Sequence, residues 1–324
     1  MKGFIIRTLI FLVPVLMAAM LIEVLLRHMP NDYRNKSQAL KHGENIEVLC
    51  LGSSHALYSV NPAYLDFKAY NAAFVAQSVD IDLKLLQHHI GDLPNLKVLM
   101  LPVTYITLAM KLEDGPEVWR MKNYNLYHDH IFPSYAIDKN SELLGAPFHA
   151  IYYRLKDYYI FGRSPLTCTP LGFGTNYKYE DRKDLASTGK LTAERHTVKD
   201  KKDYRENEAS VESIIALCKA RNVKVVLFTT PANRAYRDYL DPSQLNAAIG
   251  FARKLEKQNP GEVYYFNLFE DPDFGDADYY DGDHLNDRGA AKFSRKLNSF
   301  LTRNFPDILA AKNETPVPSV NAAK

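Results

Sequence analysis

The chain has 324 residues, of which 46% are apolar and 24% are charged, and these are the proportions of an ordinary globular protein. Its formal net charge of +2 provides no strong basic field, so the composition argues against a nucleic-acid-binding function. The three cysteines, Cys50, Cys168 and Cys218, provide neither a complete disulfide framework nor the spacing of a zinc site.

The N-terminal segment is apolar enough to be a membrane anchor. From Phe4 to Leu26 it reaches the roughly 20 residues that a spanning helix needs, and the run from Thr8 to Ile22 contains no charge. A cleaved signal peptide is the alternative, but the segment lacks a clean small-residue cleavage site. We therefore expect residues 1–29 to anchor the chain in a bacterial-type cytoplasmic membrane. Basic residues flank the segment on both sides and do not define its orientation.

Short apolar runs predict the strands of a parallel sheet. Each run is almost continuously apolar, and helical patterns lie between them, which is typical of a sheet covered by helices on both faces. The expected fold is therefore a three-layer α/β/α sandwich with about five parallel strands. The predicted strands are residues 46–51, 67–72, 97–101, 223–230 and 263–268, with helical patterns at 83–89 and 211–218.

The other segments complete the predicted organisation. Residues 30–44 are polar and are expected to form a stalk before a domain at 45–305. About residues 105–207 interrupt the strand–helix rhythm, and their length favours an inserted subdomain or lid over a simple loop. Tyrosine pairs in this insertion suit either a sugar-lined cleft or ordinary half-buried surfaces. The polar tail at 306–324 is expected to be disordered.

A glycine–serine turn follows the first predicted strand. Gly52 allows the chain to turn sharply, and Ser53, Ser54 and His55 follow where a helix begins. A serine at such a site is either a nucleophile near free backbone N–H groups or a helix cap with a local role only. Taken alone, this segment leaves both interpretations open.

A second polar cluster precedes the last predicted helix. Asp281 and His284 lie three residues apart, and Gly282 eases the turn that would bring the carboxylate to the imidazole. A carboxylate on Nδ1–H leaves Nε2 free to take a proton from a serine. One alternative is a surface loop in which Asn286 or Asp287 caps the helix. Another is a calcium loop, although the nearby aspartates do not match its alternating ligand spacing.

Both clusters lie at the same predicted edge of the sheet. Ligands of open α/β folds bind at the carboxyl ends of the strands, which is where both clusters are expected. With Gly52 and Ser54 opening the domain and Asp281 and His284 closing it, the sequence resembles the SGNH/GDSL hydrolase family over about residues 45–305. The resemblance implies that Ser54 is the nucleophile, His284 the general base and Asp281 the residue that orients the base.

The oxyanion hole of the family is only partly matched. The resemblance implies backbone N–H donors from Ser54 and Ala76, and Ala76 stands where the family's second block has a glycine. The asparagine of the third block has no match after the third strand, where Thr104 is the candidate substitute. Loss of one such donor typically costs about 10²–10³ in rate.

The divergent third block and the N-terminal anchor are similar to the envelope branch of the superfamily. This branch includes polysaccharide O-acetylation proteins and the D-alanine-transfer protein of lipoteichoic acid assembly. Residues 230–236 resemble a loop of the latter, which implies substrate-binding roles for Asn233, Arg234 and Tyr236, and a plain turn is the alternative. The resemblance also implies a membrane-bound O-acyltransferase as a partner, and a domain that faces the periplasm or the cell exterior.

The expected function is therefore O-acyl transfer, with acetyl as the expected group, to or from an envelope polysaccharide. The Ser-His-Asp mechanism needs no metal and no organic cofactor. Release of the acyl group to water, as in a carbohydrate esterase, stays open. The alternative from another class is a catalytically weak or inactive scaffold, or a glycan-binding component of a polysaccharide-modification complex. The divergent third block favours that alternative.

Overall fold

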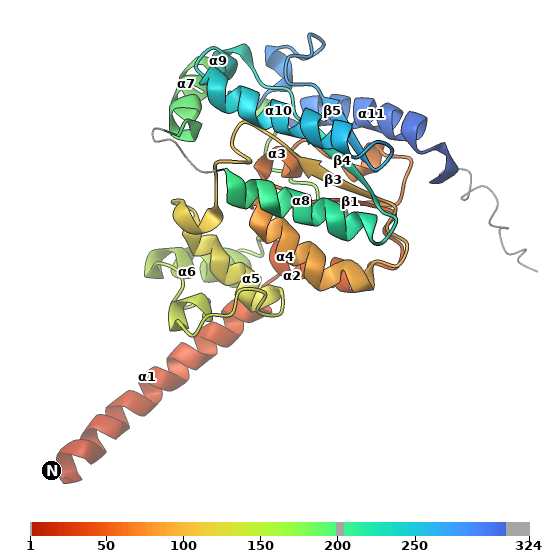
Figure 1. Cartoon of the computed structure of the whole chain (residues 1–324). Coiled ribbons are helices and arrows are strands. Elements are labelled where there is room, and N and C mark those ends of the chain that lie inside the picture. Colours follow the sequence, from red (N-terminus) through yellow and green to blue (C-terminus); the bar gives the residue numbers. More distant parts are fainter. Residues whose placement is uncertain (1, 199–203, 309–324) are drawn as a thin grey trace, which may run out of the picture. The chain divides into compact units, whose positions relative to one another are not determined.

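Figure 1 shows a computed structural model of the chain, in which residues 2–198 and 204–308 are described. The chain forms two compact units. Unit 1 comprises residues 1–41 and 112–167, and unit 2 comprises residues 42–111 and 168–324. The predicted insertion is thus divided, because only its middle part belongs to unit 1. The predicted disordered tail lies outside the described residues from position 309 onward.

Unit 2 contains a sheet of five parallel strands in the order β2-β1-β3-β4-β5, which confirms the predicted fold class. Strands β1 to β4 are almost wholly buried, as expected for strands covered on both faces, whereas β5 at the edge of the sheet is only partly buried after Val263. Their bounds are β1 Val48–Cys50, β2 Ala69–Asn71, β3 Val98–Pro102, β4 Lys224–Thr229 and β5 Val263–Asn267.

Helices cover both faces of this sheet (Figure 1). On one face α8 contacts β4, and α10 contacts β5. The helices of unit 2 are α3 Ser54–Leu57, α4 Val79–His89, α7 Leu185–His196, α8 Arg205–Lys219, α9 Arg234–Arg237, α10 Pro242–Gln258 and α11 Asp287–Asn304. Its short 3₁₀ helices are η1 Pro62–Tyr64, η2 Ile90–Asp92, η7 Tyr179–Asp181 and η8 Asp276–Asp278.

The core beneath the site joins alternate strand residues to the last helix. Successive side chains of a strand point to opposite faces, so every second residue of β1, β3 and β4 faces α11. This packing fixes the segment that precedes α11 against the carboxyl end of β1. The buried residues concerned are Val48, Cys50, Val98, Met100, Val226, Phe228, Phe293, Leu297 and Leu301.

Unit 1 is helical and contains the N-terminal apolar segment. Helix α1 is long and apolar enough to cross a membrane, and most of its apolar side chains are exposed. The helices of unit 1 are α1 Lys2–His28, α2 Asp32–Lys41, α5 Met121–Tyr127 and α6 Phe148–Leu155, with the π-helix η6 Lys156–Ile160. Short 3₁₀ helices are η3 Leu112–Asp114, η4 Val118–Arg120 and η5 Ile137–Lys139.

The segment 30–44, which we expected to be a stalk, contains α2 instead. Tyr33, Ser37 and Leu40 are buried, as is the side chain of Lys36. Residues three, four and seven apart lie on one face of a helix, and this face of α2 packs in unit 1, where α2 contacts α5. The polar composition of the segment concealed this narrow buried face.

Candidate active site

A glycine turn connects β1 to the helix that carries Ser54. Gly52 has a φ of +116°, in the region that favours glycine. A β-carbon at Gly52 would also collide with the ring of Pro102 at the end of β3. Ser53 occupies the N-cap position of α3 but makes no capping hydrogen bond through its side chain. Ser54 is therefore the first residue of α3, and the simple capping interpretation does not describe Ser53.

The loop before α11 is shaped by its own polar side chains. Asp281 Oδ1 accepts hydrogen bonds from the backbone N–H groups of Asp283 at 3.2 Å and His284 at 2.9 Å. Asn286 accepts from two backbone N–H groups of α11, so the capping role considered for this residue is real. The loop can therefore cap α11 through Asn286 and also hold Asp281 against His284, because different residues make the two sets of contacts.

The structure brings Ser54, Asp281 and His284 together. His284 Nδ1 lies 3.0 Å from Asp281 Oδ1 and 3.2 Å from Asp281 Oδ2. On the other side of the ring, His284 Nε2 lies 2.8 Å from Ser54 Oγ. With the proton assigned to Nδ1, which Asp281 favours by accepting it, Nε2 is the acceptor for the serine hydroxyl. Chemically, this arrangement can remove the proton of Ser54 as its oxygen attacks an electrophile.

A second carboxylate, which no sequence pattern singled out, approaches His284. Asp283 is buried, and its Oδ1 lies 3.1 Å from His284 Nδ1, although the angle is not that of a hydrogen bond. Its Oδ2 lies 3.2 Å from His55 Nε2 and 3.7 Å from His196 Nδ1. The His55 ring stacks on the His284 ring at 4.8 Å. One buried carboxylate thus faces three imidazoles.

Helix α7 approaches this cluster through two glycines. A β-carbon on Gly282 would collide with the backbone of Gly189 in α7, so the absence of a side chain permits the close contact. The Gly282 N–H also donates to Thr188 Oγ1 at 3.2 Å. This contact places His196, at the end of α7, beside Asp283. Glycine at position 282 therefore serves helix packing as well as the turn.

The two carboxylates determine the charge state of His284. Burial alone would lower its pKa, but the charges of Asp283 and Asp281 outweigh burial and hold the pKa of His284 well above its usual value. Burial would raise the pKa of Asp283, yet His284 and His55 hold it well below its usual value. For His196, burial dominates and lowers the pKa to about 4. His196 is therefore neutral at pH 7.

His55, Asp283 and His284 offer ligand atoms that lie within 4.8 Å of one another. A cation bound to all three would need a ring nitrogen of His284. Both of those nitrogens are already engaged, with Asp281 on one side and Ser54 on the other. Metal binding here would therefore compete with the Ser54–His284–Asp281 arrangement.

Ala76 has the backbone conformation of a glycine. Its φ is +59°, in the left-handed region. The family that the sequence resembles has a glycine at this position, and glycine adopts a positive φ without strain. Its neighbour in the same block, Asn71, is fully buried and donates to the carbonyls of Ala56 at 3.0 Å and Val60 at 2.7 Å. Asn71 thereby ties β2 to the region of α3.

We expect Ala76→Gly to raise the free energy of unfolding by about 0.5 kcal/mol. Relief of left-handed strain in alanine is worth about 1–2 kcal/mol, and the added freedom of the unfolded chain offsets roughly half of it. Ala76→Val should lower the free energy of unfolding, because a β-branched residue tolerates this φ less well. Denaturant titrations of the purified protein measure both changes. Equal stability of the three proteins would contradict a strained Ala76.

Thr104, the candidate oxyanion side chain, is engaged within the protein. It is buried, and its Oγ1 lies 3.2 Å from Thr107 Oγ1. The Thr104 N–H donates to the same Thr107 oxygen at 2.9 Å. Its role as a donor to substrate therefore has no support in this arrangement.

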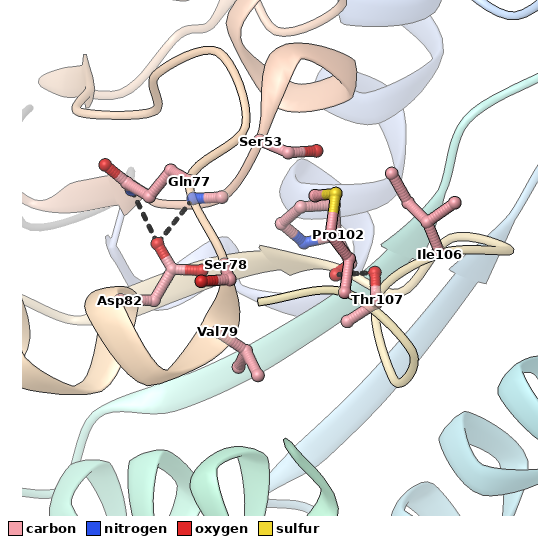
Figure 2. Close-up of a pocket in the computed structure, with 10 residues that line it drawn as sticks. Ser53, Gln77, Ser78, Val79, Asp82, Pro102, Ile106 and Thr107 are labelled. Carbon is pink, nitrogen blue, oxygen red and sulfur yellow. Dashed lines mark hydrogen bonds between the residues drawn. The ribbon is translucent and has the colours of Figure 1, made fainter. Parts of the chain in front are cut away.

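A small cavity lies behind the Gly52 turn, and a buried carboxyl group lines it (Figure 2). Its volume is about 10 Å³, which is room for roughly one water molecule. Asp82 Oδ1 accepts hydrogen bonds from the Gly52 N–H at 2.9 Å and from Gln77 Nε2 at 2.6 Å. Burial raises the pKa of Asp82 to about 8. The carboxyl group that holds the Gly52 turn is therefore largely protonated at pH 7.

We expect Asp82→Asn to stabilise the protein selectively at alkaline pH. The folded state keeps a proton on Asp82 that the unfolded chain releases near pH 4, so stability falls as pH rises from about 4 to 8. Asparagine keeps the oxygen acceptor and does not ionise, so it should remove up to about 5 kcal/mol of this decline. Denaturation at pH 5 and pH 9 tests the expectation. An identical pH dependence in both proteins would contradict a raised pKa.

The predicted substrate-binding residues do not act alike. Asn233 is buried, caps α9 and donates to Asp276 Oδ1 at 2.8 Å. Tyr236 is buried, and its hydroxyl lies 3.1 Å from His196 Nδ1. Arg234 is exposed and pairs with Asp238. Asn233 and Tyr236 therefore make contacts inside the protein. Tyr236 contacts His196, which in turn lies beside Asp283.

Three tyrosines form a stack beside His284. Tyr177 lies between Tyr58, at a centroid distance of 3.7 Å, and Tyr280, at 4.0 Å. The ring centroids of Tyr177 and His284 lie 5.3 Å apart, with the two ring planes nearly perpendicular. Tyr177 comes from the irregular segment that separates the third and fourth strands. No periodic pattern in that segment distinguishes Tyr177 from the other tyrosines, so its place beside His284 could not be predicted from the sequence.

No protein-family model matches the sequence, and no curated protein matches it. A solved structure provisionally described as a platelet activating factor from Streptococcus pneumoniae is 13% identical, with a TM-score of 0.41, covering 88% of this chain and 98% of that one. Another, provisionally described as an acylhydrolase from Bacteroides fragilis, is 10% identical, with a TM-score of 0.41, covering 85% and 95%. Similarity at this level identifies neither a family nor an activity.

Proposed function

We propose that this chain is a membrane-anchored serine acyl-ester enzyme of the SGNH/GDSL type, acting on an O-acylated envelope polysaccharide. The observation that carries the proposal is the hydrogen-bonded series from Asp281 through His284 to Ser54, in which Nε2 lies 2.8 Å from Oγ across 230 residues of sequence. A half-buried serine held by a carboxylate-oriented imidazole is the arrangement that activates a hydroxyl nucleophile.

The proposed reaction has two steps. Ser54 Oγ attacks the acyl carbonyl while its proton passes to His284 Nε2, and the tetrahedral intermediate expels the donor oxygen, which takes that proton. The second step runs in reverse: an acceptor hydroxyl gives its proton to His284 and receives the acyl group from Ser54. Asp281 and Asp283 stabilise the imidazolium between these transfers. The N–H groups of Ser54 and Ala76 are the proposed oxyanion donors.

We propose transfer to a carbohydrate hydroxyl rather than to water. The partly exposed Tyr177 and Tyr280 beside His284 support this choice, because a tyrosine offers a sugar both an apolar ring and a hydroxyl group. The full-length protein in detergent should label with a fluorophosphonate probe and hydrolyse a small activated acetyl ester slowly. Added oligosaccharides should divert the acetyl group to sugar, as detected by mass spectrometry. Fast hydrolysis with no acetylated sugar across a broad glycan panel would indicate an esterase, and absence of probe labelling would refute the serine enzyme.

A non-catalytic scaffold is the second candidate. The observation that favours it is the engagement of Thr104 with Thr107, which leaves the asparagine of the family's third block without a side-chain substitute. A scaffold would bind an envelope glycan, or a membrane-bound O-acyltransferase, without reacting with the fluorophosphonate probe. The same labelling experiment therefore separates the two candidates.

We further propose that α1 spans the cytoplasmic membrane and that unit 2 faces the periplasm or the cell exterior, where envelope glycans lie. The exposed apolar side chains of α1 support a membrane span. An alkaline phosphatase fused after Lys324 should be active in cells. An inactive phosphatase, together with an active cytoplasmic reporter at the same position, would reverse the proposed orientation.

A further inference from the structure

The end of α1 is joined to α6 and η6 within unit 1. Leu26 and Met29 are buried against Ile151 of α6. The hydroxyl of Tyr159 in η6 donates to the carbonyl of Leu25 at 2.9 Å. These contacts fix α6 and η6 beside the last turns of α1.

The first charged residues after the apolar part of α1, Glu23 and Arg27, form ion pairs and hydrogen bonds within unit 1. Glu23 pairs with Arg27 at 2.6 Å and accepts hydrogen bonds from Ser141 Oγ at 2.9 Å and the Leu143 N–H at 2.8 Å. Arg27 also donates to the carbonyl of Asn140 at 2.7 Å. Charged groups of a spanning helix belong near the boundary of the hydrocarbon layer. The contacts between α1 and the rest of unit 1 are therefore made where α1 would leave the bilayer.

Large apolar side chains are exposed in and around α6 and η6. Phe148 and Ile160 are 75% and 73% exposed, and Leu144, Tyr152 and Phe161 are each more than half exposed. We refer to these five residues as the 144–161 surface. A cluster of exposed side chains of this size is unusual on a protein that only water surrounds. The surface is continuous along the chain with the segment that contacts α1.

Basic side chains accompany the exposed rings. Lys156 Nζ lies 5.4 Å from the ring centre of Phe161 and 5.7 Å from that of Tyr152. Arg163 lies 5.1 Å from the ring centre of Phe161. Aromatic rings with adjacent basic groups are typical of the interface between lipid tails and phosphates, where an apolar stem lies below and a charge lies above.

We propose that the 144–161 surface is seated in the interface of the bilayer that α1 crosses. Its apolar side chains lie at the boundary of the acyl chains, and Lys156 and Arg163 lie at the lipid phosphates. The inference depends on the proposed membrane span of α1 but not on the chemistry of Ser54. The attachment of α6 and η6 to the last turns of α1, whose preceding apolar side chains are mostly exposed, favours lipid as the occupant over a protein partner.

Tryptophan fluorescence in lipid nanodiscs tests this placement in the full-length protein. Trp119 is the one tryptophan in the sequence, so Trp119→Phe provides a silent background. Phe148→Trp and Ile160→Trp report on the surface, and Leu16→Trp reports on the span of α1. Leu191→Trp, on an exposed residue of unit 2, is the matched control. Phospholipids brominated on the acyl chains should reduce emission from positions 148 and 160 about twofold, but leave position 191 unchanged.

The possible outcomes separate the two proposals. Quenching at position 16 without quenching at 148 and 160 overturns the inference while the membrane span stands. Absence of quenching at position 16 overturns both. Shielding of positions 148 and 160 from aqueous iodide without quenching by bromine shows that a second copy covers the surface, and it also overturns the inference. Equal quenching at positions 148, 160 and 191 also overturns the inference, because the 144–161 surface would then be no closer to the acyl chains than the control position.

Discussion

Replacing Ser54 with alanine should abolish acyl chemistry, with a loss of about 10⁶ in kcat if catalysis resembles that of other serine triads. Ser54 Oγ is the atom that His284 Nε2 approaches at 2.8 Å, so its proton is the one that this base is placed to accept. The melting temperature should change little, since a half-buried hydroxyl contributes little to packing. The measurements are fluorophosphonate labelling, turnover of an activated acetyl ester and a thermal melt.

Ser53→Ala is the matched control for this experiment. Ser53 is adjacent and buried, but its Oγ lies 3.4 Å from His55 rather than near His284. It should retain most activity. His284→Ala should be as inactive as Ser54→Ala, and the double variant should be little worse, because the residues act as a unit. An inactive Ser53→Ala together with an active Ser54→Ala would show that the nucleophile is misassigned.

Replacing Asp281 with asparagine should reduce kcat by about 10⁴, because an amide no longer selects the tautomer with the proton on Nδ1. Asp281 makes the hydrogen bonds to Nδ1, whereas Asp283 approaches it without hydrogen-bond geometry. Asp283→Asn should therefore be much less damaging at alkaline pH. If Asp283→Asn proved the more damaging change, Asp283 would be the orienting carboxylate.

The pH dependence of the two variants distinguishes their roles further. His284 must be neutral to accept the proton of Ser54, and its raised pKa means that activity should increase with pH through that pKa. Asp283→Asn removes a negative charge beside the imidazole, lowers the pKa of His284 and should move the ascending limb to lower pH. Profiles of kcat/KM against pH measure the shift. An unmoved limb would show that Asp283 does not act on the charge of His284.

The sequence predicted the parts of the molecule that periodicity and short spacing determine. Continuous apolar runs specify strands that are buried on both faces, so all five strands could be located within a few residues. Asp281 and His284 are three residues apart, and their contact depends only on one local turn. The approach of Ser54 to His284 could be expected because parallel strands present their carboxyl ends at one edge.

The rest depended on segments without a regular pattern. His196, at the end of α7, and Tyr177 reach the site from the region between the third and fourth strands, and the position of His196 depends on packing such as the contact of Gly189 with Gly282. The role of Asp283 was concealed because an aspartate two residues from Asp281 looks like part of a polar surface loop. The buried face of α2 was hidden by its polar composition.

The separation of Ser54 and His284 by 230 residues has a consequence for biosynthesis. Ser54 leaves the ribosome early, whereas the base and the helix that holds it, α11, emerge near the end of translation. Until the segment before α11 is in place on the sheet, Ser54 lacks the imidazole of His284. If Ser54 is the nucleophile, a nascent chain therefore lacks its proton acceptor until the C-terminal part has been made, and a product truncated before Asp281 carries the serine without the base that would activate it.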